Sequence, residues 1–217
     1  MNYVFWASLG FIAYTYAGYL VVLVVRSRWH RCPVRAEPIA PRVTIIVAVH
    51  NEAAALPQKL ENLLALDYPA DRLEIVAVSD GSTDGTNAIL HGRGDTRLRI
   101  LILSHHRGKA VALNEAMRAA GGEIIVFTDA RQLVERQALK HLVANFADPS
   151  VGCVSGELML GDPAGAQSAQ GLGLYWRFEK LIRRCESQSG SVVGATGALY
   201  AARKSVLAPL PEGTLLD

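Results

Sequence analysis

The 217-residue sequence is poor in charge, in aromatic side chains and in cysteine. Only 19% of the residues are charged and the net charge is +2, so composition gives no general basis for nucleic-acid binding. The three cysteines, Cys32, Cys153 and Cys185, are scattered without CxxC spacing, which argues against a disulfide framework or a cysteine zinc site and is typical of reduced thiols. The sequence also contains no HExxH motif, no Walker A lysine motif, no internal repeat and no low-complexity tract.

The longest apolar stretch runs from Val4 to Val25 and contains no charged side chain. As a helix it is about as long as the ~30 Å hydrocarbon core of a bilayer is thick. The first residues lack the basic region of a cleaved signal peptide, so the stretch predicts a transmembrane anchor over residues 1–27. Arginines follow it, and the positive-inside rule then predicts an inner- or plasma-membrane protein whose remaining chain faces the cytoplasm.

Residues 28–41 are basic and contain prolines, which predicts a short, stiff linker. After it, β-branched apolar runs alternate with segments of helical periodicity, and Pro57 is expected to delay the first helix. The expected strands are 43–49, 73–79, 98–103 and 123–128, and the expected helices are 52–66, 84–90, 109–120 and 132–146. This alternation predicts an α/β fold, with a parallel sheet flanked by helices on both faces.

The regular alternation of predicted strands and helices ends after residue 150. Here the sequence predicts one or two short strands over 151–160, a small polar loop over 161–173, a helix over 174–186 and a strand with a glycine turn over 191–200. The aromatic residues at 174–178 favour a core position over a binding platform.

Polar residues follow three of the predicted strands directly, at His50–Glu52, Ser79–Asp80 and Asp129. The carboxyl ends of parallel strands share one edge of a sheet, so these residues are expected to lie close together. Arg107 and Lys109 open an alanine-rich helix, whose N-terminal amides favour phosphate. A carboxylate beside such a helix suits a metal–diphosphate, because Mg²⁺ and Mn²⁺ accept one or two carboxylates together with phosphate oxygens.

These strand ends admit two other interpretations. Residues 79–86 are explained equally well as a strand–turn–helix connection without a ligand. A nicotinamide-dependent dehydrogenase is disfavoured, because the first strand is followed by His50-Asn51-Glu52 and not by a GxGxxG turn.

Together these segments resemble the family 2 glycosyltransferases with the GT-A fold. Within that family they look most like the membrane-bound cellulose, chitin, hyaluronan and poly-N-acetylglucosamine synthases. The resemblance covers residues from about 42 to the end, and the order and spacing of its parts are specific. It is carried by Val43–Glu52, Ser79–Thr86, Arg107–Ala110 with Asn114, Thr128–Arg131, Gly194–Ala198 and Thr214–Asp217.

The resemblance implies a nucleotide-sugar site made of His50, Asn51, Glu52, Asp80, Lys109, Asn114, Asp129 and Arg131. Glu52 and Asp80 would hold the uridine end of a UDP-sugar donor. Lys109 would approach the diphosphate, and Asp129 would bind Mg²⁺ or Mn²⁺. Thr196 and Gly197 would line the acceptor side. The implied reaction is an inverting displacement at the anomeric carbon, with a carboxylate base deprotonating the acceptor hydroxyl.

Two features depart from the family pattern. Arg131 stands in place of the second acid of the Asp-X-Asp metal motif. We hypothesise that it neutralises phosphate directly or supports the site by contacting the residues that bind the ligand. Thr214-Leu215-Leu216-Asp217 ends inside the Thr-Glu-Asp-like stretch that carries the family's base, so Asp217 is expected to be the base or its neighbour. The Gln-X-X-Arg-Trp segment and C-terminal membrane helices are also missing, so residues 42–217 are expected to form a GT-A domain without its C-terminal part. Donor binding is then a firmer expectation than turnover.

The leading interpretation is an inverting glycosyltransferase at the cytoplasmic membrane face. It would move sugar from a UDP-sugar to a polysaccharide or glycolipid acceptor, with the lipid bilayer as a further partner and no nucleic acid. One alternative is a non-processive transferase onto a lipid carrier, in the manner of dolichyl-phosphate mannose synthases. Another is a catalytically silent nucleotide-sugar-binding subunit, motivated by Arg131 and the incomplete base stretch.

Overall fold

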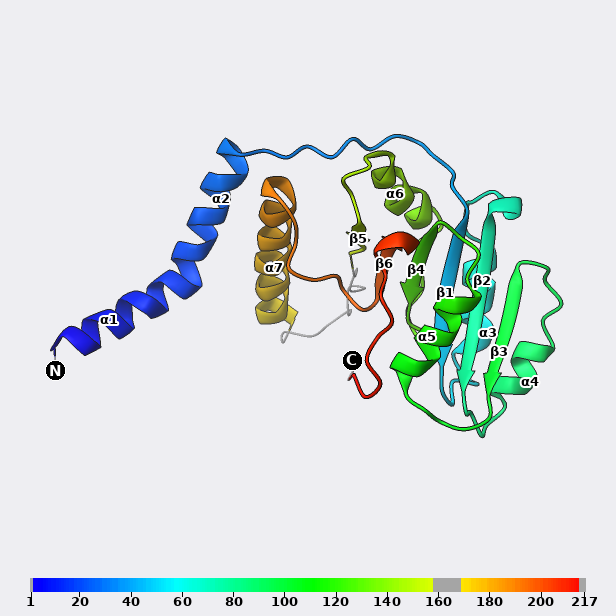
Figure 1. Cartoon of the computed structure of the whole chain (residues 1–217). Coiled ribbons are helices and arrows are strands. Elements are labelled where there is room, and N and C mark those ends of the chain that lie inside the picture. Colours follow the sequence, from blue (N-terminus) through cyan, green and yellow to red (C-terminus); the bar gives the residue numbers. More distant parts are fainter. Residues whose placement is uncertain (1, 158–168, 215–217) are drawn as a thin grey trace. The chain divides into compact units, whose positions relative to one another are not determined.

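The computed structural model describes residues 2–157 and 169–214. They fall into two compact units, one with the N-terminal helices and α7, the other with the sheet (Figure 1). The sheet unit comprises residues from Val34 to Leu158 and from Ala195 onward.

The sheet has six strands in the order β3-β2-β1-β4-β6-β5. The strands are β1 (Val43–Val49), β2 (Leu73–Asp80), β3 (Leu98–Leu103), β4 (Ile124–Thr128), β5 (Cys153–Ser155) and β6 (Leu199–Arg203). The first four are parallel, whereas β6 runs antiparallel to both β4 and β5. The prediction of a mostly parallel α/β sheet is therefore confirmed.

Helices cover both faces of the sheet (Figure 1). One face packs against α3 (Leu56–Leu64), α4 (Thr86–His91) and α6 (Ala138–Ala144), and the other packs against α5 (Lys109–Ala119). Short 3₁₀ turns occur at Ala70–Arg72, Asn145–Ala147 and Lys204–Val206. In β1, Ile45 and Val47 lie in the core under α3 while Ile46 lies in the core under α5. A strand buried on both faces must be apolar throughout, which explains the uninterrupted apolar pattern that predicted it.

Two helix starts on this sheet depend on local chemistry. Pro57 lies in the first turn of α3, which begins at Leu56, late as expected. The helix predicted over 132–146 was wrong at its start, because α6 begins only at Ala138. The residues before it are held away from a helical path, since the Asn62 amide pairs with both Val134 N and Val134 O at 2.8 Å.

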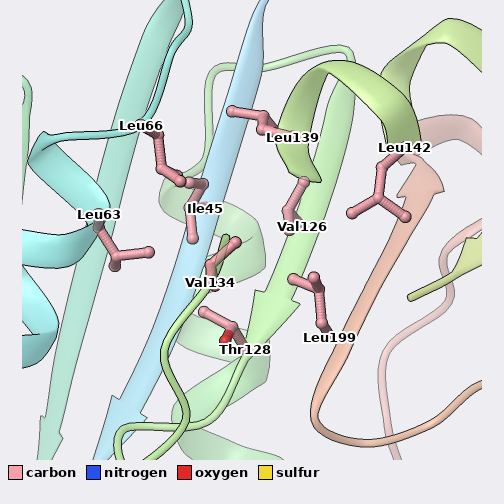
Figure 2. A pocket seen from close by; sticks show the side chains of 9 residues that line it. All are labelled: Ile45, Leu63, Leu66, Val126, Thr128, Val134, Leu139, Leu142 and Leu199. Carbon is pink, nitrogen blue, oxygen red and sulfur yellow. The ribbon is translucent and has the colours of Figure 1, made fainter. Parts of the chain in front are cut away.

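Figure 2 shows a small cavity within the core, bordered by β1, β4 and the helices that cover them. Its volume is about 10 Å³, and Thr128 is the polar residue among its otherwise apolar lining. A void of this size is close to the minimum for one water and offers too few polar partners to hold it. We therefore interpret it as a packing gap and look for the ligand site elsewhere.

The smaller unit contains α1 (Asn2–Ala13), a π-helical turn (Tyr14–Gly18), α2 (Tyr19–Trp29) and α7 (Ala169–Ser189). α2 and α7 lie side by side (Figure 1). The Tyr19 hydroxyl donates to the Glu186 carboxylate at 2.9 Å, and Arg26 Nη2 donates to Ser189 O at 3.3 Å.

The segment predicted as a membrane helix over residues 1–27 is helical in the described residues, with right-handed helical backbone at both ends of the π-helical turn. The hydrogen-bond pattern changes at Tyr14–Gly18, which divides the segment into α1 and α2. Across residues 2–157 and 169–214, no helix is both long enough and apolar enough to cross a bilayer. α1 has no buried residue, and Trp6 and Phe11 are 65% and 71% exposed.

Gly122 lies where the connection from α5 to β4 passes close to β1. A Cβ atom at this position would lie 2.5 Å from Thr44 N and 2.8 Å from Thr44 Oγ1. We expect Gly122→Ala to lower the free energy of unfolding by about 2 kcal/mol, because the backbone must move to remove the clash. Urea denaturation measures the change. Gly94→Ala is the matched control, since a Cβ at Gly94 meets no atom within 4 Å. Equal effects of the two substitutions would contradict the close approach.

Candidate functional site

An open pocket of about 350 Å³ lies at the carboxyl ends of β1, β2 and β4. β4 lies beside β1 on the side opposite to β2, so the strand order reverses at β1, and ligands of open α/β sheets bind at such a point. Six of the predicted site residues line this pocket together: His50, Glu52, Asp80, Lys109, Asp129 and Arg131. The expected convergence of strand ends is thus present in the structure.

Asp80 is the most buried carboxylate at the pocket, at 3% exposure. Its two oxygens accept from Arg107 N and Gly108 N, each at 2.8 Å. His106 Nδ1 lies 2.8 Å from Asp80 Oδ2. The carboxylate therefore fixes residues 106–108, and with them the start of α5 and the position of Lys109.

The turn after Asp80 depends on Gly81. Its φ is +62°, and a Cβ there would lie 2.2 Å from His106 N. Only glycine allows the turn after β2 to approach the turn after β3 so closely.

Asn51 ties the turn after β1 to the turn after β2. Its own backbone is left-handed, with φ at 54°, a conformation that asparagine tolerates better than most residues. Asn51 N donates to Ser82 Oγ at 3.1 Å, and Asn51 Oδ1 accepts from Thr83 N at 2.8 Å. Asn51 thus shapes the rim of the site, and its predicted contact with a donor stays a prediction.

Two histidine rings stack at the pocket, His50 and His106, with centroids 4.1 Å apart and planes tilted by 38°. His50 Nδ1 lies 2.7 Å from Asp80 O. Because a carbonyl oxygen only accepts, Nδ1 carries a proton, and Nε2 lies 3.2 Å from the Asn51 amide nitrogen. His106 was not among the predicted site residues. A loop histidine beside a second histidine carries no sequence signal for this stacking.

Two ion pairs cross the open side of the pocket. Arg131 Nε donates to both oxygens of Glu52, at 2.9 and 3.1 Å, and Lys109 Nζ donates to Asp129 Oδ1 at 2.9 Å. The hydrogen bond to Glu52, and then its charge, raises the pKa of the Arg131 guanidinium, so this side chain stays cationic. Its side chain is 77% exposed, so solvent weakens the pair and the pair opens at small cost.

The residues present fit a divalent cation only in part. Asp129 is the carboxylate at the end of β4, and Arg131 occupies the position where a second acid is expected. Within the described ranges, no group of three or more His, Cys, Asp or Glu side chains is arranged to hold a metal ion. A single carboxylate suits Mg²⁺ or Mn²⁺ when phosphate oxygens and water complete the coordination. Asp129 therefore fits an ion that arrives with a diphosphate.

Lys59 lies beneath this edge and was missed by the sequence analysis. It is on α3 and has no exposed surface, and its Nζ donates to Thr128 Oγ1 at 2.8 Å and to Gln132 O at 2.5 Å. A signal existed, because Lys59 follows Leu56 by three residues and precedes Leu63 by four, which places it on the apolar stripe of the helix.

Four of the described predicted site residues are not among those that line the pocket: Asn51, whose contacts are given above, Asn114, Thr196 and Gly197. Asn114 on α5 forms two hydrogen bonds with the backbone of Leu210. Its side-chain nitrogen donates to Leu210 O and its side-chain oxygen accepts from Leu210 N, both at 2.8 Å. Thr196 N donates to Ser155 Oγ at 3.0 Å, so Thr196 and the adjacent Gly197 lie at the turn that leads into β6. Asp217, the predicted base or its neighbour, lies outside the described residues.

Sequence comparison identifies the family. The Glycosyl transferase family 2 profile matches residues 44–207. The poly-beta-1,6-N-acetyl-D-glucosamine synthase of Staphylococcus aureus (strain COL) is 28% identical over 167 residues, which are 76% of this chain and 40% of that protein. An N-acetylglucosaminyltransferase of Azorhizobium caulinodans is 29% identical over 182 residues, which are 81% of this chain and 45% of that protein.

Solved structures agree on the fold. A mannosyltransferase from Pyrobaculum calidifontis, solved with GDP-Man and Mn²⁺, superposes with a TM-score of 0.73 at 34% identity, over 91% of this chain and 55% of that one. Staphylococcus aureus TarS, solved with UDP-GlcNAc, gives a TM-score of 0.52 at 24% identity over 58% of this chain and 36% of that one, a likeness of fold alone.

The fold and site define an α/β protein of the GT-A type. The chain belongs to glycosyl transferase family 2, as its resemblance predicted. It spans less than half the length of the two curated relatives named above.

The buried ammonium of Lys59 makes stability depend on pH. Burial lowers the pKa of Lys59 to about 8 from its ordinary 10.5. Between these values the unfolded chain binds more protons here than the folded protein, so rising pH stabilises the fold through this group. Relative to Lys59→Met, we expect the free energy of unfolding of the wild type to increase by roughly 2 kcal/mol between about pH 7 and about pH 10.

Urea denaturation of both proteins at the two pH values measures this difference, in which the contributions of other titrating groups cancel. A difference that stays constant or decreases with pH would contradict a buried, protonated Lys59.

Proposed function

We propose that this chain is the donor-binding part of an inverting glycosyltransferase that uses a UDP-sugar. One observation carries the proposal: Lys109 and Arg131 flank the pocket at the point where the strand order reverses, beside the first turn of α5. Two cations and the amides of a helix N-terminus form an environment suited to a diphosphate. A dehydrogenase lacks support, because no glycine-rich turn follows β1.

The donor would lie across the ends of β1, β2 and β4. Glu52 and the Asp80 region would hold the nucleoside, beside the stacked rings of His50 and His106. Lys109 and Arg131 would leave their carboxylate partners and bind the diphosphate. Asp129 would hold Mg²⁺ or Mn²⁺ together with phosphate oxygens, and such an ion, when bound, supplies positive charge to the diphosphate.

In the proposed reaction, the acceptor hydroxyl oxygen bonds to the anomeric carbon while the bond from that carbon to phosphate breaks. The acceptor proton passes to a carboxylate base, and the nucleoside diphosphate leaves with the electron pair. We assign the base to the stretch around Asp217. The preceding residues run near the pocket, because Glu212 lies 3.7 Å from Arg107 in the loop that Asp80 holds. Lys109 and Arg131 would stabilise the charge that develops on the leaving group.

The names of the relatives favour N-acetylglucosamine as the transferred sugar, and that of the Staphylococcus aureus synthase favours a polysaccharide as the acceptor. A glycolipid acceptor stays a prediction. The likeness to a mannosyltransferase solved with GDP-Man supports a second candidate, mannosyl transfer from GDP-mannose. The lipid-carrier acceptor of this candidate stays a prediction. The donors of the two candidates differ in both nucleobase and sugar, so measurements of donor binding distinguish the candidates.

We infer that the smaller unit associates with a membrane and that the sheet unit lies on its cytoplasmic side. The support is the exposed apolar surface of α1, together with Arg26 and Arg28 in the last turn of α2. Apolar side chains exposed along a whole helix are costly in water and favourable in lipid.

Isothermal titration of the detergent-solubilised chain tests the donor site. UDP, UDP-GlcNAc, GDP, GDP-mannose and NAD are titrated with Mn²⁺ or with EDTA. We expect uridine nucleotides to bind, and Asp129→Ala and Arg131→Ala each to weaken UDP binding about tenfold, since each removes a charge-assisted contact. Asp129→Ala should mainly reduce the part that depends on Mn²⁺, while Arg131→Ala should reduce binding in EDTA as well.

Lys140→Met is the control, because Lys140 forms a surface pair with Asp67. A folded wild-type chain that binds no nucleoside diphosphate would refute the proposed donor site. Preferential binding of GDP-mannose would show that the second candidate, mannosyl transfer, is the correct function. If Arg131→Asp strengthened Mn²⁺-dependent binding many-fold, direct phosphate neutralisation by Arg131 would be wrong.

A further inference from the structure

Lys59 is an unusual core residue. It lies among the apolar residues of α3, where Leu56, Leu60 and Leu63 are, like Lys59 itself, without exposed surface. Its ammonium donates to a hydroxyl and a backbone carbonyl, and both acceptors are uncharged. No carboxylate contacts it in the part of the chain that the structure describes.

Such a charge is costly in a core. Burying an ammonium away from water disfavours folding unless hydrogen bonds and opposite charge compensate, and burial accordingly lowers the pKa of Lys59. The negative charge of Asp129 offsets part of this effect, because it raises the pKa of Lys59. An apolar side chain of similar length would fill this place without the desolvation cost. The cationic side chain therefore calls for a reason other than packing.

The two acceptors of Lys59 bracket the site residues of the turn after β4. Thr128 directly precedes Asp129, and Gln132 directly follows Arg131. A single ammonium thus bonds to both ends of the turn that carries the carboxylate and the guanidinium. One helical turn further along α3, Asn62 holds Val134 by its backbone N and O. Together, Lys59 and Asn62 fix the segment from residue 128 to residue 134.

The same turn is also held from the pocket side, because Arg131 bonds to Glu52 and Asp129 bonds to Lys109. Those contacts are partly exposed, and the proposed donor would replace them. The contact of Lys59 with Thr128 is buried and its contact with Gln132 O is partly buried, and both would persist when the donor binds. Lys59 is thus placed to keep the turn in position while the donor replaces Glu52 and Lys109 as partners on the pocket side.

We propose that Lys59 is a positioning residue that holds Asp129 and Arg131 in the geometry required by the donor diphosphate, and so sets donor affinity. The inference rests on the proposed donor site. Lys59 acts through the turn and does not touch the donor.

Two measurements on the whole chain test this. Titration with UDP and Mn²⁺ should give an affinity about tenfold weaker for Lys59→Met, the size of loss typical when a residue that orients a site's contacts is removed. Thr128→Val, which keeps the shape of the side chain but deletes one acceptor, should weaken binding about threefold. Lys140→Met makes the same lysine-to-methionine change on the surface and should leave affinity unchanged.

Amide hydrogen exchange supplies the second measurement. In Lys59→Met the amides of residues 130–134 should exchange faster, while those of β2 and β3 should exchange at wild-type rates. A role in packing alone predicts a different result, namely lower stability with unchanged UDP affinity.

The outcomes separate the inference from the proposed function. A folded Lys59→Met chain with wild-type affinity and wild-type exchange at 130–134 would overturn the positioning role. If Lys59→Met fails to fold, Thr128→Val decides by the same criteria. If the wild type binds no nucleoside diphosphate, the proposed donor site fails, and hydrogen exchange alone decides whether Lys59 holds the turn.

Discussion

The polar edge of the sheet is held together by the carboxylate of Asp80, which accepts hydrogen bonds from two backbone amides. A buried carboxylate is costly unless hydrogen bonds satisfy it, and charge-assisted bonds of this kind contribute about 1.5–3 kcal/mol each. Here they come from Arg107 N and Gly108 N. Gly108 has a left-handed backbone, with φ at 93°, and α5 begins at the next residue. The end of β2 therefore determines where α5 starts and where Lys109 points.

Contacts at this edge fall into two groups of different strength. The turns are fixed by contacts with backbone groups of neighbouring turns, which are partly buried for Asp80 and Lys59 and exposed for Asn51. The ion pairs that face the pocket, Glu52–Arg131 and Lys109–Asp129, are partly exposed and individually weak. An anionic ligand can therefore take over the two cations at small cost while the backbone keeps its position. This division gives a preorganised site whose own charges neutralise one another until a ligand enters.

Much of this arrangement was predictable because its causes are local in sequence. Runs such as residues 43–49 are apolar throughout because both faces of the strand are buried, and parallel strands bring His50, Asp80 and Asp129 to one edge. What escaped prediction depends on partners distant in the chain. Asn114 binds the peptide of Leu210, and the start of α6 is delayed by Asn62. Neither partner can be identified from helical periodicity.

The arginine at position 131 is consistent with the charge balance of the pocket. A carboxylate there would add a negative charge beside Glu52 and Asp129, whereas Arg131 compensates Glu52 by sharing its Nε–H between the two oxygens of that carboxylate. The exchange of an acid for an arginine changes the local charge by two positive units, which is the charge of one divalent cation. A diphosphate entering the pocket then meets fixed positive charge from Arg131 and Lys109 before any ion binds. In the proposed donor complex the single carboxylate of Asp129 would be enough, because phosphate oxygens and water would complete the coordination of Mg²⁺ or Mn²⁺.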